Sequence, residues 1–268
     1  MVTTIEEAKI YAVNVTSGKL TSAQVSVRLE SFKKYKENAI GAEEKQDWQR
    51  QIDELQIWAN SETFTSGDFP QGIDTLVFDL IEWRAMIYAF TQANTKDNPF
   101  HKFPFFSQWL VGATYAVFSI IGKLNSHYPD DTSLRKVWGK IRPFIEQDGV
   151  RLIDEIHYID ECLSNRLTKS RSKALQFRHK VIAHNEKNLN LSWDDIDPDI
   201  QMLVRIWALI VSWCSYGVLP PFYRSKDIFA GLESYYDQED MAVLHAKRDE
   251  YIERTKTWCK TYLHNGQP

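Results

Sequence analysis

Apolar residues recur at steps of three and four along most of the chain, which is the spacing of one face of an α-helix. The stripe in residues 42–61 consists of Trp48, Ile52, Leu55 and Trp58. A second stripe predicts a long helix over about residues 147–168, and it consists of Leu152, Ile156, Ile159, Leu163 and Leu167. Because no alternation typical of a β-strand extends beyond a few residues, the pattern predicts an all-α helical bundle with short connections.

Two runs, residues 105–124 and 206–222, are apolar enough to be tested as membrane spans. Neither is a clean stretch of the about 20 apolar residues that a transmembrane helix requires. The first run contains Ser and Thr side chains and a Gln, and the second is broken by Pro220 and Pro221. We therefore expect both runs to form buried core helices, and we expect no membrane association.

A segment rich in turn-forming residues, 61–72, is the best candidate for a linker, because Gly67, Pro70 and Gly72 interrupt the helical pattern there. It follows a polar-surfaced N-terminal helical section, residues 1–66. The first helix of that section is predicted to begin at a Thr cap followed by Glu6 and Glu7, which suit the positive end of a helix. We expect residues 1–268 to form a single all-α unit.

Composition places the protein among soluble globular chains, with 43% hydrophobic and 25% charged residues. The formal net charge of −4 gives no general basic excess of the kind that many nucleic-acid-binding domains show, although a local basic patch remains compatible with it. Three scattered cysteines, Cys162, Cys214 and Cys259, are typical of reduced thiols rather than of disulfides or a zinc site. With no secretory signal pattern at the N-terminus, we expect a cytoplasmic protein.

The candidate chemistry lies in one segment, FRHKVIAHN, residues 177–185. On a helical wheel at about 100° per residue, Arg178 falls inside the apolar cluster that surrounds Leu175. A guanidinium group in that position is costly unless it is paired or reaches a cleft or a subunit interface. His184 lies at the border of the cluster, whereas His179 and Lys180 are predicted to face water.

Simpler interpretations of the same residues stay open. Arg178 can form an internal ion pair with a carboxylate of a neighbouring helix, for which the candidates are Asp154, Glu155, Asp160 and Glu161. His184 can be a histidine at a helix C-terminus, which is favourable there. Four further acidic residues, Asp194, Asp195, Asp197 and Asp199, lack the pattern of a calcium loop, and we interpret them as N-capping residues.

The segment resembles the signature of HEPN domains, which are nucleotide-binding helical domains of prokaryotes and higher eukaryotes, and in particular that of their abortive-infection-like branch. In this signature an Arg is followed by a polar residue and then, with four to six residues between it and the Arg, by a His. Arg178, His179 and His184 match these three positions. The resemblance implies a four-helix core over residues 72–217, and it leaves the N-terminal section and a C-terminal helical tail, residues 218–268, without a counterpart.

The resemblance also implies an activity, because many HEPN proteins are endoribonucleases that use no metal and share one active site across a homodimer. Such a reaction uses the ribose 2′-OH as nucleophile and therefore acts on RNA and not on DNA. A histidine can transfer the proton near neutral pH, and an arginine can stabilise the charge on the phosphate. His184 and Arg178 then become the catalytic pair, with no metal and no cofactor.

In the same hypothesis, other residues of this region assist the catalytic pair or bind the RNA. His179 and Asn185 can orient the catalytic histidine or contact the RNA, and the residues expected to contact RNA are Lys169, Arg171, Lys173 and Lys180. We expect an RNA substrate, a homodimer with a composite site, an antitoxin partner and a role as a toxin or in phage defence. The alternative hypothesis is a HEPN-like helical module that binds a protein partner or a nucleotide without catalysis.

Overall fold

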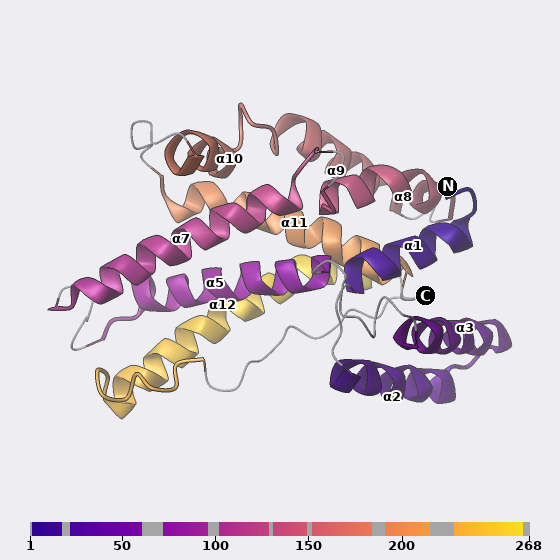
Figure 1. Ribbon diagram of the computed structural model, residues 1–268, viewed down its shortest axis with the longest axis horizontal. Helices are drawn as coiled ribbons and strands as arrows, with labels where there is room; N and C mark the ends of the chain where they lie inside the picture. The colour runs from indigo at the N-terminus through magenta and orange to yellow at the C-terminus, as the bar shows by residue number, and fades with distance from the viewer. Residues whose placement is uncertain are drawn as a thin grey trace. The chain divides into compact units, whose positions relative to one another are not determined.

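The protein is all-helical in a computed structural model of the chain (Figure 1), which confirms the predicted class of a helical bundle. The structure describes residues 2–17, 22–60, 72–95, 102–128, 131–148, 152–183, 191–214 and 228–264. Within these ranges the chain forms helices that are joined by short turns, and no β-strand occurs. The predicted spacing of apolar residues therefore indicated the right type of element.

The chain divides into two compact units rather than the single unit that we predicted. The larger unit combines residues 1–16 with residues 73–268, and the smaller unit comprises residues 17–72. The predicted N-terminal section, residues 1–66, is therefore wrong as a structural unit, because its first helix belongs to the larger unit. That helix, α1 (Ile5–Ser17), places Ala8 and Ala12 in the main core with no exposed surface.

The start of α1 agrees with the sequence prediction. The hydroxyl oxygen of Thr4 accepts a hydrogen bond from the backbone N–H of Glu7 at 3.2 Å. In return the Glu7 carboxylate accepts from the backbone N–H of Thr3 at 2.7 Å. The first of these bonds satisfies a backbone N–H group that the first turn of a helix leaves without a partner, and the second fixes the residue that precedes the cap.

Four long helices form most of the larger unit: α5 (Ile73–Gln92), α7 (Pro104–Leu124), α11 (Trp193–Cys214) and α12 (Gln238–His264). Both α7 and α12 run alongside α5, as Figure 1 shows. Helix α11 is the central one, because 15 of its 22 residues are buried. A helix that is apolar on nearly all sides is stable only when other elements surround it.

The predicted C-terminal tail, residues 218–268, is part of the bundle rather than an addition to it. Its helix α12 packs along α5, and Tyr251 has no exposed surface. The guanidinium of Arg248 also forms two hydrogen bonds of 2.7 Å with the carboxylate of Glu82 on α5. The boundary that we predicted at residue 217 therefore does not separate a core from a tail.

A second layer of shorter helices consists of α8 (Leu134–Asp148), α9 (Ile153–Asn165), α10 (Lys173–Phe177) and the π-helix η2 (Arg178–Ala183). The helix that we predicted over about residues 147–168 is confirmed in its central part, because α9 covers Ile153–Asn165, but it is shorter than predicted at both ends. The apolar stripe itself is confirmed, since its buried members are Ile156, Ile159, Leu163 and Leu167. Periodicity identified the buried face but not the ends of the helix.

The smaller unit contains a helical hairpin of α2 (Ser22–Asn38) and α3 (Ala42–Ala59). Trp48 on α3 is 2% exposed and packs its ring against those of Phe32 and Tyr35 on α2, at centroid distances of 5.5 and 5.1 Å. Ile52, one turn further along α3, is also buried. The predicted stripe on α3 is therefore the face that holds the hairpin together.

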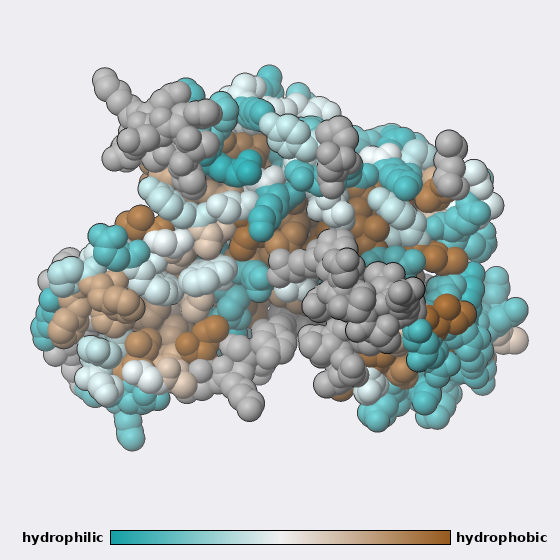
Figure 2. All heavy atoms as spheres, viewed as in Figure 1, coloured by the Kyte–Doolittle hydropathy of each residue, from teal (hydrophilic) through white to brown (hydrophobic). Residues whose placement is uncertain are grey.

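Helix α7 is the only helix within the described ranges that is long and apolar enough to cross a membrane, and 39% of its apolar window is buried. One such helix also occurs in the cores of soluble proteins, and Val117 and Ile121 of α7 do lie in the main core. The opposite face leaves Val111 and Tyr115 47% and 40% exposed. Figure 2 shows apolar side chains gathered near the N-terminal end of α7. The prediction of a fully buried helix therefore holds for one face only.

Candidate active site

The segment that carries the predicted active site changes from an α-helix to a π-helix at Arg178. Helix α10 begins after Ser172, whose hydroxyl oxygen accepts a hydrogen bond from the backbone N–H of Leu175 at 3.2 Å. The π-helix η2 then begins at Arg178. Because a π-helix has more residues per turn than an α-helix, a wheel at 100° per residue does not apply beyond this point. Such π-turns are rare and are frequent at functional sites.

The structure corrects the predicted position of Arg178. Ala174 and Leu175 are buried, as the wheel predicted, and Phe177 is half-buried with its ring 4.9 Å from that of Phe118 on α7. Arg178 itself is exposed and does not lie within the apolar core. The side chains of Val181 and Ile182, which the prediction placed beside it, lie outside the described part of the structure.

Although it is exposed, Arg178 lies closely against α7. At Gly122, which is buried, an added Cβ atom would come within 2.6 Å of the guanidinium carbon of Arg178. Atoms that are not bonded do not approach so closely, so any side chain at this position would have to displace the arginine. The absence of a side chain at Gly122 therefore determines where the guanidinium lies.

None of the four carboxylates that we considered as partners of Arg178 binds it. Glu155 pairs with Arg205 at 2.6 Å, and Asp160 pairs with Arg142 at 2.8 Å. Among the residues that the structure describes, no carboxylate lies within ion-pair distance of Arg178. The interpretation of Arg178 as an internal ion pair is therefore not supported, and its positive charge remains available to an external anion.

The other members of the predicted site are described only in part. His179 and Lys180 are exposed, as the sequence predicted. His184 and Asn185 belong to residues 184–190, which lie outside the described residues.

The predicted RNA-contacting lysines and arginine differ in their surroundings. Lys169 and Arg171 are exposed in the turn between α9 and α10, and Arg171 donates a hydrogen bond to the backbone carbonyl of Asn165 at 3.1 Å. Lys173 pairs with Asp195 at 2.6 Å, and this contact helps to hold the pKa of the Asp195 carboxyl below its usual range. Lys169 and Lys180 are thus the candidates whose charges are not engaged within the described residues, and Lys173 is the most engaged.

The acidic residues at the start of α11 do more than cap it. Asp195 accepts hydrogen bonds from the backbone N–H and the hydroxyl of Ser192, as expected for a residue near a helix start. Asp197 and Asp199, however, are 4% and 1% exposed, so the capping interpretation is wrong for these two. Among the described residues, no three His, Cys, Asp or Glu side chains converge on one point.

Asp199 connects α11 to the helix that leads into Arg178. Its carboxylate accepts hydrogen bonds from the hydroxyl of Ser172 at 2.6 Å and from Nε of Arg166 at 3.1 Å. Burial raises the pKa of the Asp199 carboxyl, and the two donors oppose that effect. Because Ser172 also caps α10, this contact fixes the start of the segment on which Arg178 is carried.

A buried charge cluster on the other side of α11 was missed in the sequence. Arg84 on α5 is 3% exposed and forms hydrogen bonds of 2.7 and 2.9 Å with the carboxylate of Asp197. The Asp197 carboxylate also accepts a hydrogen bond of 3.1 Å from the hydroxyl of Tyr251. The guanidinium of Arg84 lies 4.3 Å from the centre of the Trp193 ring. The sequence carried a signal, because Arg84 stands within the apolar run LIEWRAMIYAF.

No protein-family model matches the chain, and neither a curated protein nor a solved structure matches it. The likeness to HEPN domains therefore rests on the Arg178, His179 and His184 spacing and remains a prediction. What the structure adds is chemical: an exposed guanidinium without a carboxylate partner can bind a phosphate group through two hydrogen bonds.

Proposed function

We propose that the protein is a HEPN-type endoribonuclease that cleaves RNA without a metal or a cofactor, with Arg178 and His184 as its catalytic residues. Its biological role in this proposal is that of a cytoplasmic toxin or a phage-defence protein of the abortive-infection type, with an antitoxin as partner. The observation that carries the proposal is that Arg178 is exposed on a π-turn and has no carboxylate partner among the described residues.

In the proposed reaction His184 removes the proton from a ribose 2′-OH, and the 2′-oxygen attacks the adjacent phosphorus atom. A new P–O2′ bond forms while the P–O5′ bond breaks, and a protonated histidine returns a proton to the 5′-oxygen. Arg178 stabilises the negative charge that grows on the non-bridging oxygens. The products carry a 2′,3′-cyclic phosphate and a 5′-hydroxyl, and DNA is not a substrate because it lacks the nucleophile.

The proposed homodimer brings two copies of each catalytic residue to one cleft. In support of it, the outward face of α7 exposes Val111 and Tyr115 on the helix against which Arg178 packs. In the proposed dimer the second chain covers these half-exposed apolar side chains. Light scattering of the purified protein would measure the oligomeric state, and a monomer at all concentrations would contradict this part of the proposal.

The toxin role is tested by induced expression in cells. We expect expression of the unaltered protein to stop growth and expression of His184→Ala at the same level to permit it. Growth arrest by both proteins would show that the effect does not require the proposed histidine, and normal growth with both would contradict the toxin role.

The alternative function, a HEPN-like module that binds a protein partner or a nucleotide, uses the same unpaired Arg178 for phosphate binding alone. The net charge of −4 favours this alternative, because ribonucleases usually carry basic surface. The two functions differ in one measurement, which uses an RNA with a single 2′-deoxy position. The ribonuclease leaves that linkage intact and cuts the others, whereas a binding module cuts none.

A further inference from the structure

Positive side chains gather around the C-terminal end of α7, close to the helix that carries Arg178. Lys123 lies in the last turn of α7, Arg135 in the first turn of α8, and Lys169 in the turn before α10. Lys123 and Lys169 are exposed, and within the described ranges none of the three is paired with a carboxylate. In contrast, cations elsewhere in the larger unit, such as Arg142, Arg205 and Arg248, have carboxylate partners.

Hydrogen bonds fix this arrangement from three directions. Nη1 of Arg135 donates to the backbone carbonyl of Leu167 at 2.9 Å and to the side-chain oxygen of Asn125 at 3.1 Å. The amide nitrogen of Asn125 donates to the same Leu167 carbonyl at 3.0 Å. The end of α7, the start of α8 and the turn that carries Lys169 are therefore held together as one rigid surface.

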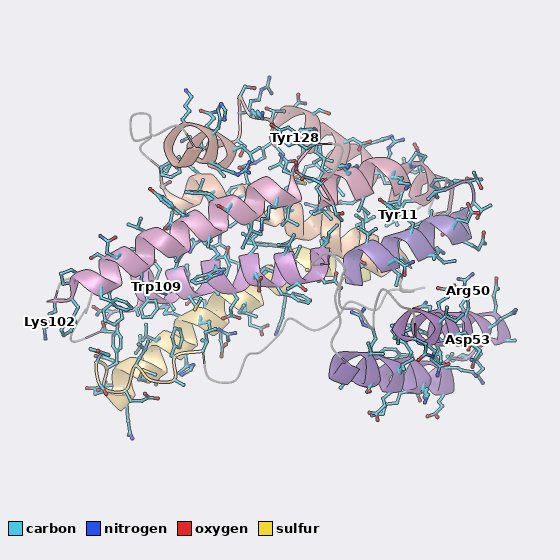
Figure 3. The ribbon with its side chains drawn as sticks, in the orientation of Figure 1. Tyr11, Arg50, Asp53, Lys102, Trp109 and Tyr128 are labelled. Atoms are coloured by element: carbon cyan, nitrogen blue, oxygen red, sulfur yellow. The ribbon has the colours of Figure 1, made fainter. Side chains whose placement is uncertain are left out.

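His127 follows Asn125 by two residues and stands among these cations. Partial burial and the positive charges of Arg135 and Lys169 lower the pKa of its imidazole below the usual range. The next residue, Tyr128, is 68% exposed. Figure 3 shows Tyr128 beyond the end of α7 in the larger unit. Tyr128 directly follows His127, on which both cations act, so an exposed aromatic ring lies near positive charge in the chain. Sites for single-stranded nucleic acids combine aromatic rings that stack on bases with positive groups that contact phosphates.

This surface is continuous with Arg178. Arg178 packs on Gly122, and Arg135 binds Asn125, which lies three residues further along the chain. Residues three apart lie on the same side of a helix, so the two arginines occupy neighbouring positions along the end of α7. Positive charge therefore extends from Arg178 past Arg135 to His127 within one unit of the molecule. Lys123, the residue after Gly122, lies about 100° around α7 from the Arg178 contact and extends the positive charge around the other side of the helix end.

We propose that this surface, formed by Lys123, His127, Tyr128, Arg135 and Lys169, binds single-stranded RNA beside the scissile linkage. The lysines and arginines contact successive phosphates, and Tyr128 stacks on an unpaired base. The inference rests on the proposed ribonuclease function, because it supplies the substrate track for that active site. It also explains how a chain with net charge −4 can hold a polyanion, since the positive charge is local.

The test measures binding separately from cleavage, in the full-length chain with His184→Ala. Fluorescence anisotropy of a labelled single-stranded RNA gives the dissociation constant at several salt concentrations. In this background Lys123→Gln with Lys169→Gln removes two charges from the surface, and neither lysine makes a hydrogen bond that the fold needs. We expect about tenfold weaker binding, and the slope of log K against log salt is expected to fall by about 1.4, at ~0.7 per phosphate contact.

A matched control removes two charges from the smaller unit. Lys33→Gln with Lys45→Gln changes exposed lysines of α2 and α3 and is expected to leave RNA affinity and salt slope unchanged. Tyr128→Ala is expected to weaken RNA binding at least fivefold, because the variant loses the stacking of a base on the aromatic ring. The slope of log K against log salt is expected to stay unchanged, because stacking releases no ions.

Three outcomes would overturn the inference. The control variant could bind RNA as weakly as the variant with Lys123→Gln and Lys169→Gln, or this second variant could bind RNA with unchanged affinity. The full-length chain with His184→Ala alone could also fail to bind RNA. Failure of the ribonuclease proposal gives a different result, because RNA would then bind through this surface but remain uncut by the unaltered chain. Equal affinity for double-stranded RNA would contradict the role of Tyr128, since paired bases cannot stack on it.

Discussion

Arg84 and Arg178 both follow apolar residues on a helix, but the two side chains end in opposite surroundings. Arg84 lies on a regular α-helix opposite Asp197, and its charge is neutralised inside the core. Arg178 stands where the chain becomes a π-helix, and its side chain turns over Gly122 to the surface. A buried charge without a partner is very costly, so a core arginine requires an acid nearby, whereas an exposed one can serve an external ligand.

The first prediction concerns the buried pair. Asp197→Asn removes the negative charge that neutralises Arg84 and is expected to lower the free energy of unfolding by about 3–5 kcal/mol. Glu146→Gln, which removes an ion pair of Arg142 on the half-exposed face of α8, is the control and is expected to cost less than about 1 kcal/mol. Urea denaturation followed by circular dichroism measures both, and similar losses in the two variants would contradict the assigned role of Asp197.

The second prediction concerns the proton on His127. Because burial, Arg135 and Lys169 lower its pKa, the folded state binds a proton less readily than the unfolded state, whose value is about 6.5. Stability is therefore expected to decrease as the pH falls through 6.5 toward the folded-state pKa. The nearby carboxylate of Asp131 is held by the hydroxyl of Ser126.

An NMR titration of the imidazole measures this directly. The midpoint of His127 is expected below pH 6.5 in the free protein, and it is expected to rise in Lys169→Gln or when single-stranded RNA is added. A midpoint at or above 6.5 that responds to neither change would show that these cations do not surround the histidine.

At the scale of elements, the sequence indicated helices and their apolar faces well, but not the partners of those faces. The stripe of α9 and the pair Trp48 and Ile52 of α3 are buried as predicted. The start of α9 at Ile153 was predicted too early, at about residue 147, because an apolar period does not mark where a helix begins. The placement of α1 and α12 in the main bundle depends on contacts distant in sequence, which a helical period does not contain.

At the candidate site, too, the sequence predicted the residues of one segment but not the contacts that this segment makes with other helices. The spacing of Arg178, His179 and His184 could be seen in the sequence, and the exposure of His179 and Lys180 agreed with the wheel. The π-turn and the contact with Gly122 could not be predicted, because they depend on how α7 packs against the segment. His127 and Arg135 were missed since they lie after the end of α7 and at the start of α8, and they join the site only in three dimensions.

The third prediction tests the packing of η2 on α7. Gly122→Ala is expected to displace the guanidinium of Arg178 and to reduce RNA cleavage at least tenfold while the helical content is kept. Gly139→Ala in α8 is the control, because an added Cβ there would meet no atom within 4 Å. This control should retain activity and gain up to about 1 kcal/mol from the better helix propensity of alanine. Equal cleavage rates in the two variants would show that Gly122 does not position Arg178.

At the scale of the whole molecule, the chain combines a large helical bundle with a small helical hairpin unit inserted near its N-terminus. The bundle carries every residue of the proposed site that the structure describes, together with the positive surface at the end of α7. Both segments of the bundle that flank the smaller unit are anchored, since Ala12 and Ile73 are buried in the same core. We therefore expect the bundle to fold and act without the smaller unit.

The fourth prediction follows from this division. Replacing residues 17–72 by a flexible linker of about 12 Gly and Ser residues is expected to leave the larger unit folded. Thermal unfolding should stay cooperative, with a midpoint within about 4 °C of that of the larger unit in the intact chain. Binding of single-stranded RNA is also expected to persist. A linear, non-cooperative loss of helix signal on heating would show that the bundle requires the smaller unit.

The central claim is that Arg178 and His184 cleave RNA without a metal, and the most direct test is a cleavage assay in excess EDTA. The unaltered protein is expected to cut single-stranded RNA and to leave 2′,3′-cyclic phosphate ends. Arg178→Ala and His184→Ala are each expected to cut at least about 100-fold more slowly, the usual size of a lost proton-transfer or charge-stabilising group. Cleavage by either variant at the unaltered rate, or no cleavage by the unaltered protein in EDTA, would contradict the claim.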